Sequence, residues 1–219
     1  MSENIELMMP IKAAPYEHQK KAFAFACDKF GVFDNQLKSR GTALLMEMGT
    51  GKTVVSIAIS GCMYQYGKIN RVLVVAPLSL LGVWEEEFEK FADFPYSLTV
   101  LKGTAAKKKK QLTKLPGKGL QIVVVNYESA WRLEKELITY NADLVITDEA
   151  HKLKENRSKQ SQGMQHIGDK ARYKLLLTGT VITNRELDVF SQYRFLNPQI
   201  FGTSFYAFRH QTFDMGGYG

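Results

Sequence analysis

The chain has 219 residues, 45% hydrophobic and 23% charged, which suits a globular protein with one sizeable α/β domain or two small ones. No apolar run reaches the ~18 residues of a membrane helix, the N-terminus lacks a secretory pattern, and Cys27 and Cys62 form no CxxC pair. We therefore expect a cytoplasmic protein with free thiols and no membrane partner, and the net charge of +7 favours a polyanionic partner without establishing one.

Short apolar runs alternate along the chain with longer segments of helical spacing. Strands are expected over residues 42–46, 71–76, 97–101, 121–125, 143–147 and 172–177. Helices are expected over residues 52–64, 80–91, 129–138, 186–195 and 204–211. The strands are continuously rich in Val, Ile and Leu, which indicates burial on both faces and hence a parallel sheet covered by helices on both sides. The lysine run 107–110 is expected to be a solvated surface loop, with a DNA clamp as the alternative.

A glycine-containing segment, GTGKT at residues 49–53, follows the first expected strand and opens a helix. Glycines let backbone N–H groups curl around an anion, and the helix N-terminus adds partial positive charge. Lys52 can then reach the β- and γ-phosphates of a nucleotide, and the Thr53 hydroxyl can bind Mg²⁺. The strict pattern has glycine where this chain has Met46, so a tight turn with an incidental lysine is the alternative. The strand–loop–helix context favours a phosphate-binding loop.

Two adjacent carboxylates, Asp148 and Glu149, directly follow the expected strand 143–147. Ligands of parallel sheets bind at the carboxyl ends of the strands, so we expect both side chains beside the phosphate loop. Asp148 is then placed to hold Mg²⁺, and Glu149 to orient and deprotonate an attacking water. A solvated acidic turn is the alternative.

The order GTGKT, DEAH (148–151) and LTGT (177–180) resembles the first RecA-like lobe of superfamily-two helicases. Finer matches resemble the Swi/Snf-like branch, which comprises DNA-translocating, helicase-like ATPases. These matches are PYEHQ at 15–19, EMGTGKT at 47–53, APLSLLGVWEEEFEKF at 76–91, VNYE at 125–128, DEAHKLKENRSKQSQ at 148–162, LTGTVITN at 177–184 and FLNPQIFG at 195–202. The resemblance covers nearly the whole chain and implies a RecA-like P-loop NTPase lobe, with a single ATP-binding domain over residues 1–219.

The resemblance also implies a role for each residue that matches a motif. Catalysis would fall to Lys52, Asp148 and Glu149, and Mg²⁺ would be placed by Thr53 and Asp148. The residues expected to bind ATP are Gln19, as the reader of adenine, and Met48, Gly49, Thr50, Gly51, Lys52 and Thr53. The residues expected to couple the nucleotide to the nucleic-acid face are His151, Thr178, Gly179 and Thr180. The residues expected to contact the nucleic-acid backbone are Pro77, Ser79, Asn126 and Tyr127. Double-stranded DNA is the expected partner, so the protein would work where the DNA is, in the nucleoid if bacterial.

The family also uses a second RecA-like lobe that carries an arginine finger, and nothing after Phe213 could supply it. We therefore expect the partner lobe to belong to the full-length protein. Such an arginine supplies ~10³–10⁵ in rate in comparable enzymes, so the isolated chain is expected to bind ATP weakly and turn over little. Val181 and Thr183 replace the proline and glutamine usual in the third motif, which could alter coupling to DNA movement.

Other functions remain as alternatives. A lobe of a DEAH- or DEAD-type RNA helicase would carry a different third motif from LTGTVITN. A nucleotide-switched interaction module without hydrolysis would not need the water-activating carboxylate of Glu149. A small-molecule P-loop kinase would leave the DEAH and LTGT motifs unexplained.

Overall fold

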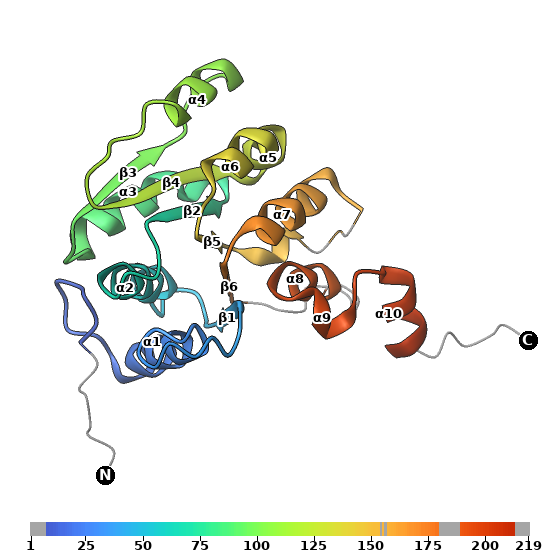
Figure 1. The fold of residues 1–219 in the computed structure, drawn as a ribbon, viewed down its shortest axis with the longest axis horizontal. Coiled ribbons are helices and arrows are strands. Elements are labelled where there is room, and N and C mark those ends of the chain that lie inside the picture. The colour runs from blue at the N-terminus through green and yellow to red at the C-terminus, as the bar shows by residue number, and fades with distance from the viewer. Residues whose placement is uncertain (1–7, 154, 156, 180–188, 213–219) are drawn as a thin grey trace, which may run out of the picture.

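The computed structural model describes residues 8–153, 155, 157–179 and 189–212, and Figure 1 shows their arrangement. Within them, six strands form one sheet in which every neighbouring pair is parallel. The strands are β1 (Gly41–Leu45), β2 (Arg71–Ala76), β3 (Tyr96–Val100), β4 (Leu120–Asn126), β5 (Leu144–Thr147) and β6 (Tyr173–Thr178). Their order across the sheet is β1-β6-β5-β2-β4-β3. The predicted α/β class with a parallel sheet is confirmed.

Helices cover both faces of this sheet. They are α1 (Glu17–Lys29), α2 (Lys52–Gln65), α3 (Leu81–Phe91), α4 (Ala105–Leu112), α5 (Tyr127–Arg132), α6 (Glu134–Tyr140), α7 (Lys159–Lys170), α8 (Val189–Leu196), α9 (Pro198–Phe201) and α10 (Phe205–Thr212), with 3-10 turns at Leu78–Leu80 and Ala150–Leu153. In Figure 1, α1 and α2 lie on one side of the sheet and α5 to α8 on the other. None of the described helices is both long and apolar enough to cross a membrane.

Two hydrophobic cores result, one on each face of the sheet. Val72 and Val74 of β2 point into the core shared with α1, α2 and α3. Leu73 and Val75, which alternate with them, point into the core shared with α5, α6, α7 and α8. All four side chains are fully buried. Because successive strand residues face opposite sides, burial of every one of them requires helices on both faces.

The structure corrects two expectations about local structure. The helix expected over 129–138 is divided at Leu133 into α5 and α6. The lysine run is not a loop, because it forms most of α4. The Thr104 side chain caps that helix by accepting a hydrogen bond from the backbone N–H of Lys107. Alanine and lysine are good helix formers, and the helix is also tied to its surroundings by the ion pair of Lys109 with Glu136 and the hydrogen bond from Lys108 to the Ser129 hydroxyl.

Candidate functional site

The segment expected to bind phosphate connects β1 to α2 at the carboxyl edge of the sheet. Gly49 has φ of 79° and Gly51 has φ of 89°, a left-handed conformation that favours glycine. Gly51 is also the N-cap of α2. The first N–H groups of a helix have no intrahelical acceptor, so this loop presents donors and a positive helix end to an anion.

Lys52 is buried at the start of α2, and its ammonium group is held by the loop itself. Its Nζ donates to the carbonyl oxygens of Met46 at 2.9 Å and Glu47 at 3.0 Å. The Thr50 hydroxyl donates to the same Glu47 oxygen at 2.7 Å. The lysine therefore lies beside the glycine loop, with its ammonium held by two loop carbonyls.

Gln19 lies against this loop from the first turn of α1. Its Nε2 donates to the Thr50 carbonyl at 3.1 Å, and its Oε1 accepts from the backbone N–H of Tyr16 at 3.0 Å. A Cβ atom at Gly51 would lie only 2.2 Å from Gln19 Nε2, so any larger residue there would displace the Gln19 amide from the loop. The structure thus joins Gln19 to the loop, and its role as the adenine reader stays a prediction.

Asp148 follows β5 and is almost fully buried beside the loop. Its Oδ2 accepts a hydrogen bond from Trp84 Nε1 at 2.9 Å, and its Oδ1 accepts from the Glu149 N–H at 2.9 Å. Burial raises the pKa of the Asp148 carboxyl, and the hydrogen bond from Trp84 opposes that rise. The two donors fix the carboxylate in one orientation.

Trp84 has a role that sequence reasoning missed. The helical spacing of α3 predicts a core residue, and Trp84 is 1% exposed. Its indole N–H nevertheless reaches Asp148, 64 residues further along the chain. A buried indole N–H usually needs an acceptor, which was the available signal, but the sequence does not say which acceptor is used.

Glu149 has φ of 49°, which is unusual for a residue other than glycine and costs about 1–3 kcal/mol of backbone strain. Its Oε2 lies 3.1 Å from Nδ1 of His151. A pocket of about 280 Å³ brings the predicted groups together, and it is lined by Met48, Gly49, Gly51, Lys52, Thr53, Leu80, Val83, Glu87, Asp148 and Glu149. A lysine, a hydroxyl and three carboxylates therefore share one cavity, and two of these carboxylates, Asp148 and Glu149, were predicted from the sequence.

Two of the residues predicted to couple the site to nucleic acid, Thr178 and Gly179, lie next to the loop. Thr178 is buried at the end of β6, and its carbonyl accepts a hydrogen bond from the Met46 N–H at 3.3 Å. A Cβ atom at Gly179 would lie 3.4 Å from the Met46 carbonyl oxygen. Thr180, Val181 and Thr183 lie outside the described residues.

The residues predicted to contact the nucleic-acid backbone differ in exposure. Ser79 is exposed and Pro77 is half-buried, both directly after β2. Asn126 is mostly buried at the end of β4, and its Oδ1 has no hydrogen-bond partner within the part of the chain that the structure describes. The Tyr127 side chain points inward, and its hydroxyl donates to the Asp148 carbonyl at 2.7 Å. Burial raises the pKa of that hydroxyl.

The parallel sheet and the groups gathered at its carboxyl edge define a RecA-like lobe. The family model described as SNF2-related domain matches residues 16–215, so the chain belongs to that family. The Swi/Snf-like resemblance predicted from the motifs is thereby confirmed.

Relatives and solved structures agree with this assignment. The chain is 29% identical over 200 residues to "Switch 2" of Arabidopsis thaliana, covering 85% of this chain and 22% of that protein. It is 28% identical over 202 residues to the "DNA repair and recombination protein RAD54-like" of Drosophila ananassae, covering 87% of this chain and 24% of that protein. The Sulfolobus solfataricus SWI2/SNF2 ATPase core in complex with dsDNA matches with a TM-score of 0.76 and 30% identity, covering 92% of this chain and 39% of that chain. The chain thus spans less than a quarter of these two curated relatives.

Proposed function

We propose that the chain binds Mg-ATP at the carboxyl edge of its sheet, as the first lobe of a DNA-dependent ATPase and translocase. One observation carries the proposal: Lys52, Asp148 and Glu149 line a single cavity together with the glycine loop. Phosphoryl transfer needs a cation on the phosphates, an oxygen ligand for the metal and a group that positions the attacking water. The cavity offers each of these.

The oxygen ligands in the cavity suit Mg²⁺. Thr53 offers a hydroxyl and Asp148 a carboxylate, and Mg²⁺ in nucleotide sites typically takes one or two carboxylates together with waters and substrate phosphates. No cluster of three His, Cys, Asp or Glu side chains that could hold a metal occurs among the described residues, so the nucleotide would complete the ligand set. When bound, Mg²⁺ would neutralise charge on the β- and γ-phosphates.

The protein groups then have separate tasks. Lys52 would move from the carbonyls of Met46 and Glu47 to the phosphate oxygens. Glu149 would orient and deprotonate the water, while His151 holds one of its carboxylate oxygens. Trp84 would keep the Asp148 carboxylate aimed at the cavity. Gln19 would recognise adenine at the end of the loop that it already contacts.

DNA and a second lobe complete the proposal. The solved structure of the Sulfolobus core contains dsDNA, and this chain covers 39% of that core. We infer that Pro77, Ser79, Asn126 and Tyr127 lie on the DNA-facing side, and that a second lobe elsewhere in the full-length protein supplies the arginine finger. The isolated chain would then bind ATP with little turnover.

The test is ATP binding and ATP turnover by this chain alone, with and without dsDNA, single-stranded DNA and RNA. Lys52→Ala should weaken ATP binding on the order of 100-fold, because charge-assisted hydrogen bonds to the phosphates are lost. Lys114→Ala, at an exposed lysine after α4, serves as the matched control and should bind ATP normally. Turnover should stay near background with every nucleic acid.

Each of the other outcomes would overturn one part of the proposal or favour an alternative function. ATP binding that ignores Lys52→Ala would overturn the nucleotide site. Robust turnover that Lys52→Ala abolishes would overturn the requirement for a second lobe. Turnover stimulated only by RNA would favour the RNA-helicase alternative. Normal ATP binding by the full-length protein, with no turnover on any nucleic acid, would favour a nucleotide-switched module.

A further inference from the structure

A second buried lysine lies at the opposite, amino-terminal edge of the sheet. Lys174 is the second residue of β6 and is only 4% exposed. Its backbone N–H donates to the Arg40 carbonyl at 2.7 Å, which ties β6 to the chain just before β1. Its ammonium lies 5.9 Å from the centre of the Phe195 ring, and its Cδ lies close to Gly168. An aromatic face and a helix backbone therefore replace much of its water.

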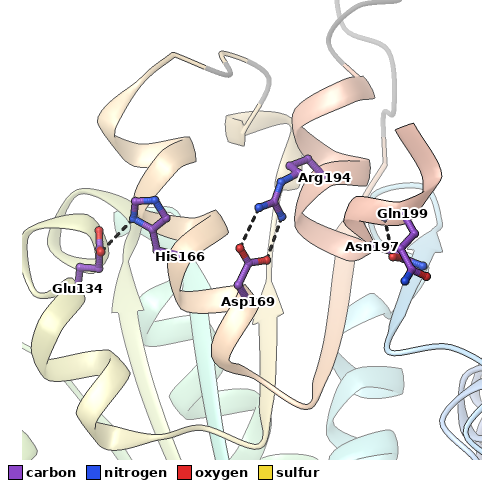
Figure 2. A network of polar contacts seen from close by, with 6 residues as sticks. All are labelled: Glu134, His166, Asp169, Arg194, Asn197 and Gln199. Atoms are coloured by element: carbon purple, nitrogen blue, oxygen red, sulfur yellow. Dashed lines mark hydrogen bonds and ion pairs between the residues drawn. The ribbon is translucent and has the colours of Figure 1, made fainter. Parts of the chain in front are cut away.

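The carboxylate that interacts electrostatically with Lys174 is already hydrogen-bonded to another residue. Asp169 at the end of α7 accepts two hydrogen bonds from the Arg194 guanidinium, at 2.9 and 2.8 Å. Figure 2 shows the two side chains facing each other as a parallel fork. Among the described residues, neither an ion pair nor a hydrogen bond is found for the Lys174 ammonium.

The remaining neighbours carry the same sign of charge. Burial lowers the pKa of Lys174 to about 8, Asp169 opposes that change, and Arg194 and Arg40 add to it. Among the described residues, the charged groups that act on Lys174 are thus two cations and one carboxylate. The Arg40 side chain is exposed, and within the described part of the chain it has no ion pair. Such a cluster is stabilised by an added anion.

A cavity stands in front of these cations. Its volume is about 520 Å³, and it is lined by Leu37, Lys38, Ser39, Arg40, Asp169, Ala171, Lys174, Leu196, Asn197, Pro198 and Gln199. We call it the amino-edge pocket. Lys38 adds no net charge, because it already pairs with Asp28 and Asp34. Asn197 is held in place by accepting a hydrogen bond from the Gln199 N–H at 2.9 Å (Figure 2).

We propose that the amino-edge pocket binds a phosphate group, with Lys174 and Arg40 as its cationic ligands. A compact dianion balances both charges, whereas a single carboxylate leaves one of them uncompensated. Arginine presents a planar fork that matches phosphate oxygens, and lysine supplies a point charge. The phosphate can be free or a monoester, because the cavity is larger than the phosphate group alone. The proposal is independent of ATP binding, since this pocket and the glycine loop lie at opposite edges of the sheet.

Thermal unfolding with inorganic phosphate tests the proposal, at constant ionic strength and near pH 7. The Lys52→Ala protein is used as the background, because the glycine loop could also bind phosphate. Phosphate about tenfold above its Kd should raise Tm by about 3 °C, and acetate should not. Lys174→Met and Arg40→Gln should each abolish the rise, whereas Lys38→Met, on the same wall of the pocket, should retain it. A larger rise with ethyl phosphate would identify a monoester as the better ligand, and an equal rise would identify the free ion; both support the site.

Two results would overturn the proposal. One is the absence of any phosphate-dependent rise in the Lys52→Ala background. The other is a rise that survives Arg40→Gln and Lys174→Met alike. If Lys174→Met does not fold, Arg40→Gln decides alone, because its side chain is exposed and its loss should leave the fold intact.

Discussion

Two buried lysines lie at opposite edges of the same sheet, and their surroundings differ. Lys52, at the carboxyl edge, donates to two carbonyl oxygens and lies near the Asp148 carboxylate. Lys174, at the amino edge, has an aromatic ring and two arginines around it, and Asp169, its one carboxylate neighbour in the described part of the chain, is bound to Arg194. Burial of a charge is tolerable where acceptors point at it, and otherwise the pKa of the group must change. The fold thus supplies hydrogen-bond acceptors to Lys52. In our proposal, Lys174 obtains its acceptor from a bound phosphate.

Among the substitutions considered, removal of the Lys174 charge should change the free energy of unfolding most. The pKa of Lys174 is about 8 in the folded chain against 10.5 ordinarily. Between these values the unfolded chain binds more protons, so the free energy of unfolding should rise with pH across this window. Below about pH 8, Lys174 is protonated in both the folded and the unfolded chain, so the full free-energy cost of burying its charge remains. Lys174→Met should therefore stabilise the protein near pH 7 by up to ~3 kcal/mol, with the difference disappearing above about pH 10.

Urea unfolding of both proteins from about pH 6 to pH 10, in buffer without phosphate, measures this difference. A stability difference that does not change with pH would show that Lys174 is satisfied in some other way, and the comparison with Lys52 would fail. Added phosphate should narrow the gap near pH 7, because it stabilises only the protein that retains the lysine.

Trp84→Phe tests how much the hydrogen bond from Trp84 stabilises the buried Asp148 carboxylate at the carboxyl edge. The change keeps an aromatic ring in the core but leaves Asp148 Oδ2 without its indole donor. We expect a loss of about 2 kcal/mol in unfolding free energy, within the range for a buried acceptor that loses its partner. The expected companion effect is a further rise in the pKa of Asp148, since the Trp84 hydrogen bond lowers it.

Trp131→Phe is the matched control, because Trp131 is the other tryptophan of the chain and is partly exposed. It should change stability by less than about 0.5 kcal/mol. Equal losses from the two substitutions would mean that ring packing, and not the bond to Asp148, explains the effect. NMR titration of the Asp148 carboxyl would report the pKa directly.

Tyr127→Phe should have a smaller effect at the same edge. It removes the hydroxyl that donates to the Asp148 carbonyl, a neutral hydrogen bond worth about 1 kcal/mol. Chemical denaturation measures the loss, and ATP affinity measured alongside shows whether Asp148 has moved. Unchanged stability together with weaker DNA affinity of the full-length protein would mean that the Tyr127 hydroxyl serves the proposed DNA-facing side and contributes nothing through the Asp148 carbonyl.

Lys38→Met should have the smallest effect. Its ammonium is exposed and already paired with Asp28 and Asp34 near the same edge as Lys174. Exposed pairs contribute little, so we expect no measurable change in Tm at any pH between about 6 and 10. A pH-dependent change as large as that of Lys174→Met would remove the distinction between buried and exposed lysines.

The carboxyl edge was predictable from the sequence because each element there is marked locally. GTGKT follows one apolar run and Asp148 another, and the parallel-sheet rule brings the two strand ends together. The bond from Trp84 to Asp148 could not be predicted, since it depends on how α3 packs on the sheet.

Lys174 gives no signal in RYKLLL, where a lysine near a strand end suggests a solvated position. Its burial arises from Phe195 and Gly168, which only the packing of α7 and α8 brings to it. The lysines of α4 were misread because a run of like charge was weighed above the helix propensity of alanine and lysine and the cap at Thr104.

The position of β1 has a consequence for how the protein is made. Among the strands that the structure describes, β1 lies at one end of the sheet and pairs with β6 alone, although it precedes the other five in the chain and β6 follows them. The strand β1, which leads into the glycine loop, therefore has no partner strand until synthesis has passed Thr178. The nascent chain can assemble β2, β3 and β4 earlier, so a nucleotide could not template the early steps of folding. A ribosome stalled before β6 should carry a chain with a partly formed sheet and no capacity to hold ATP.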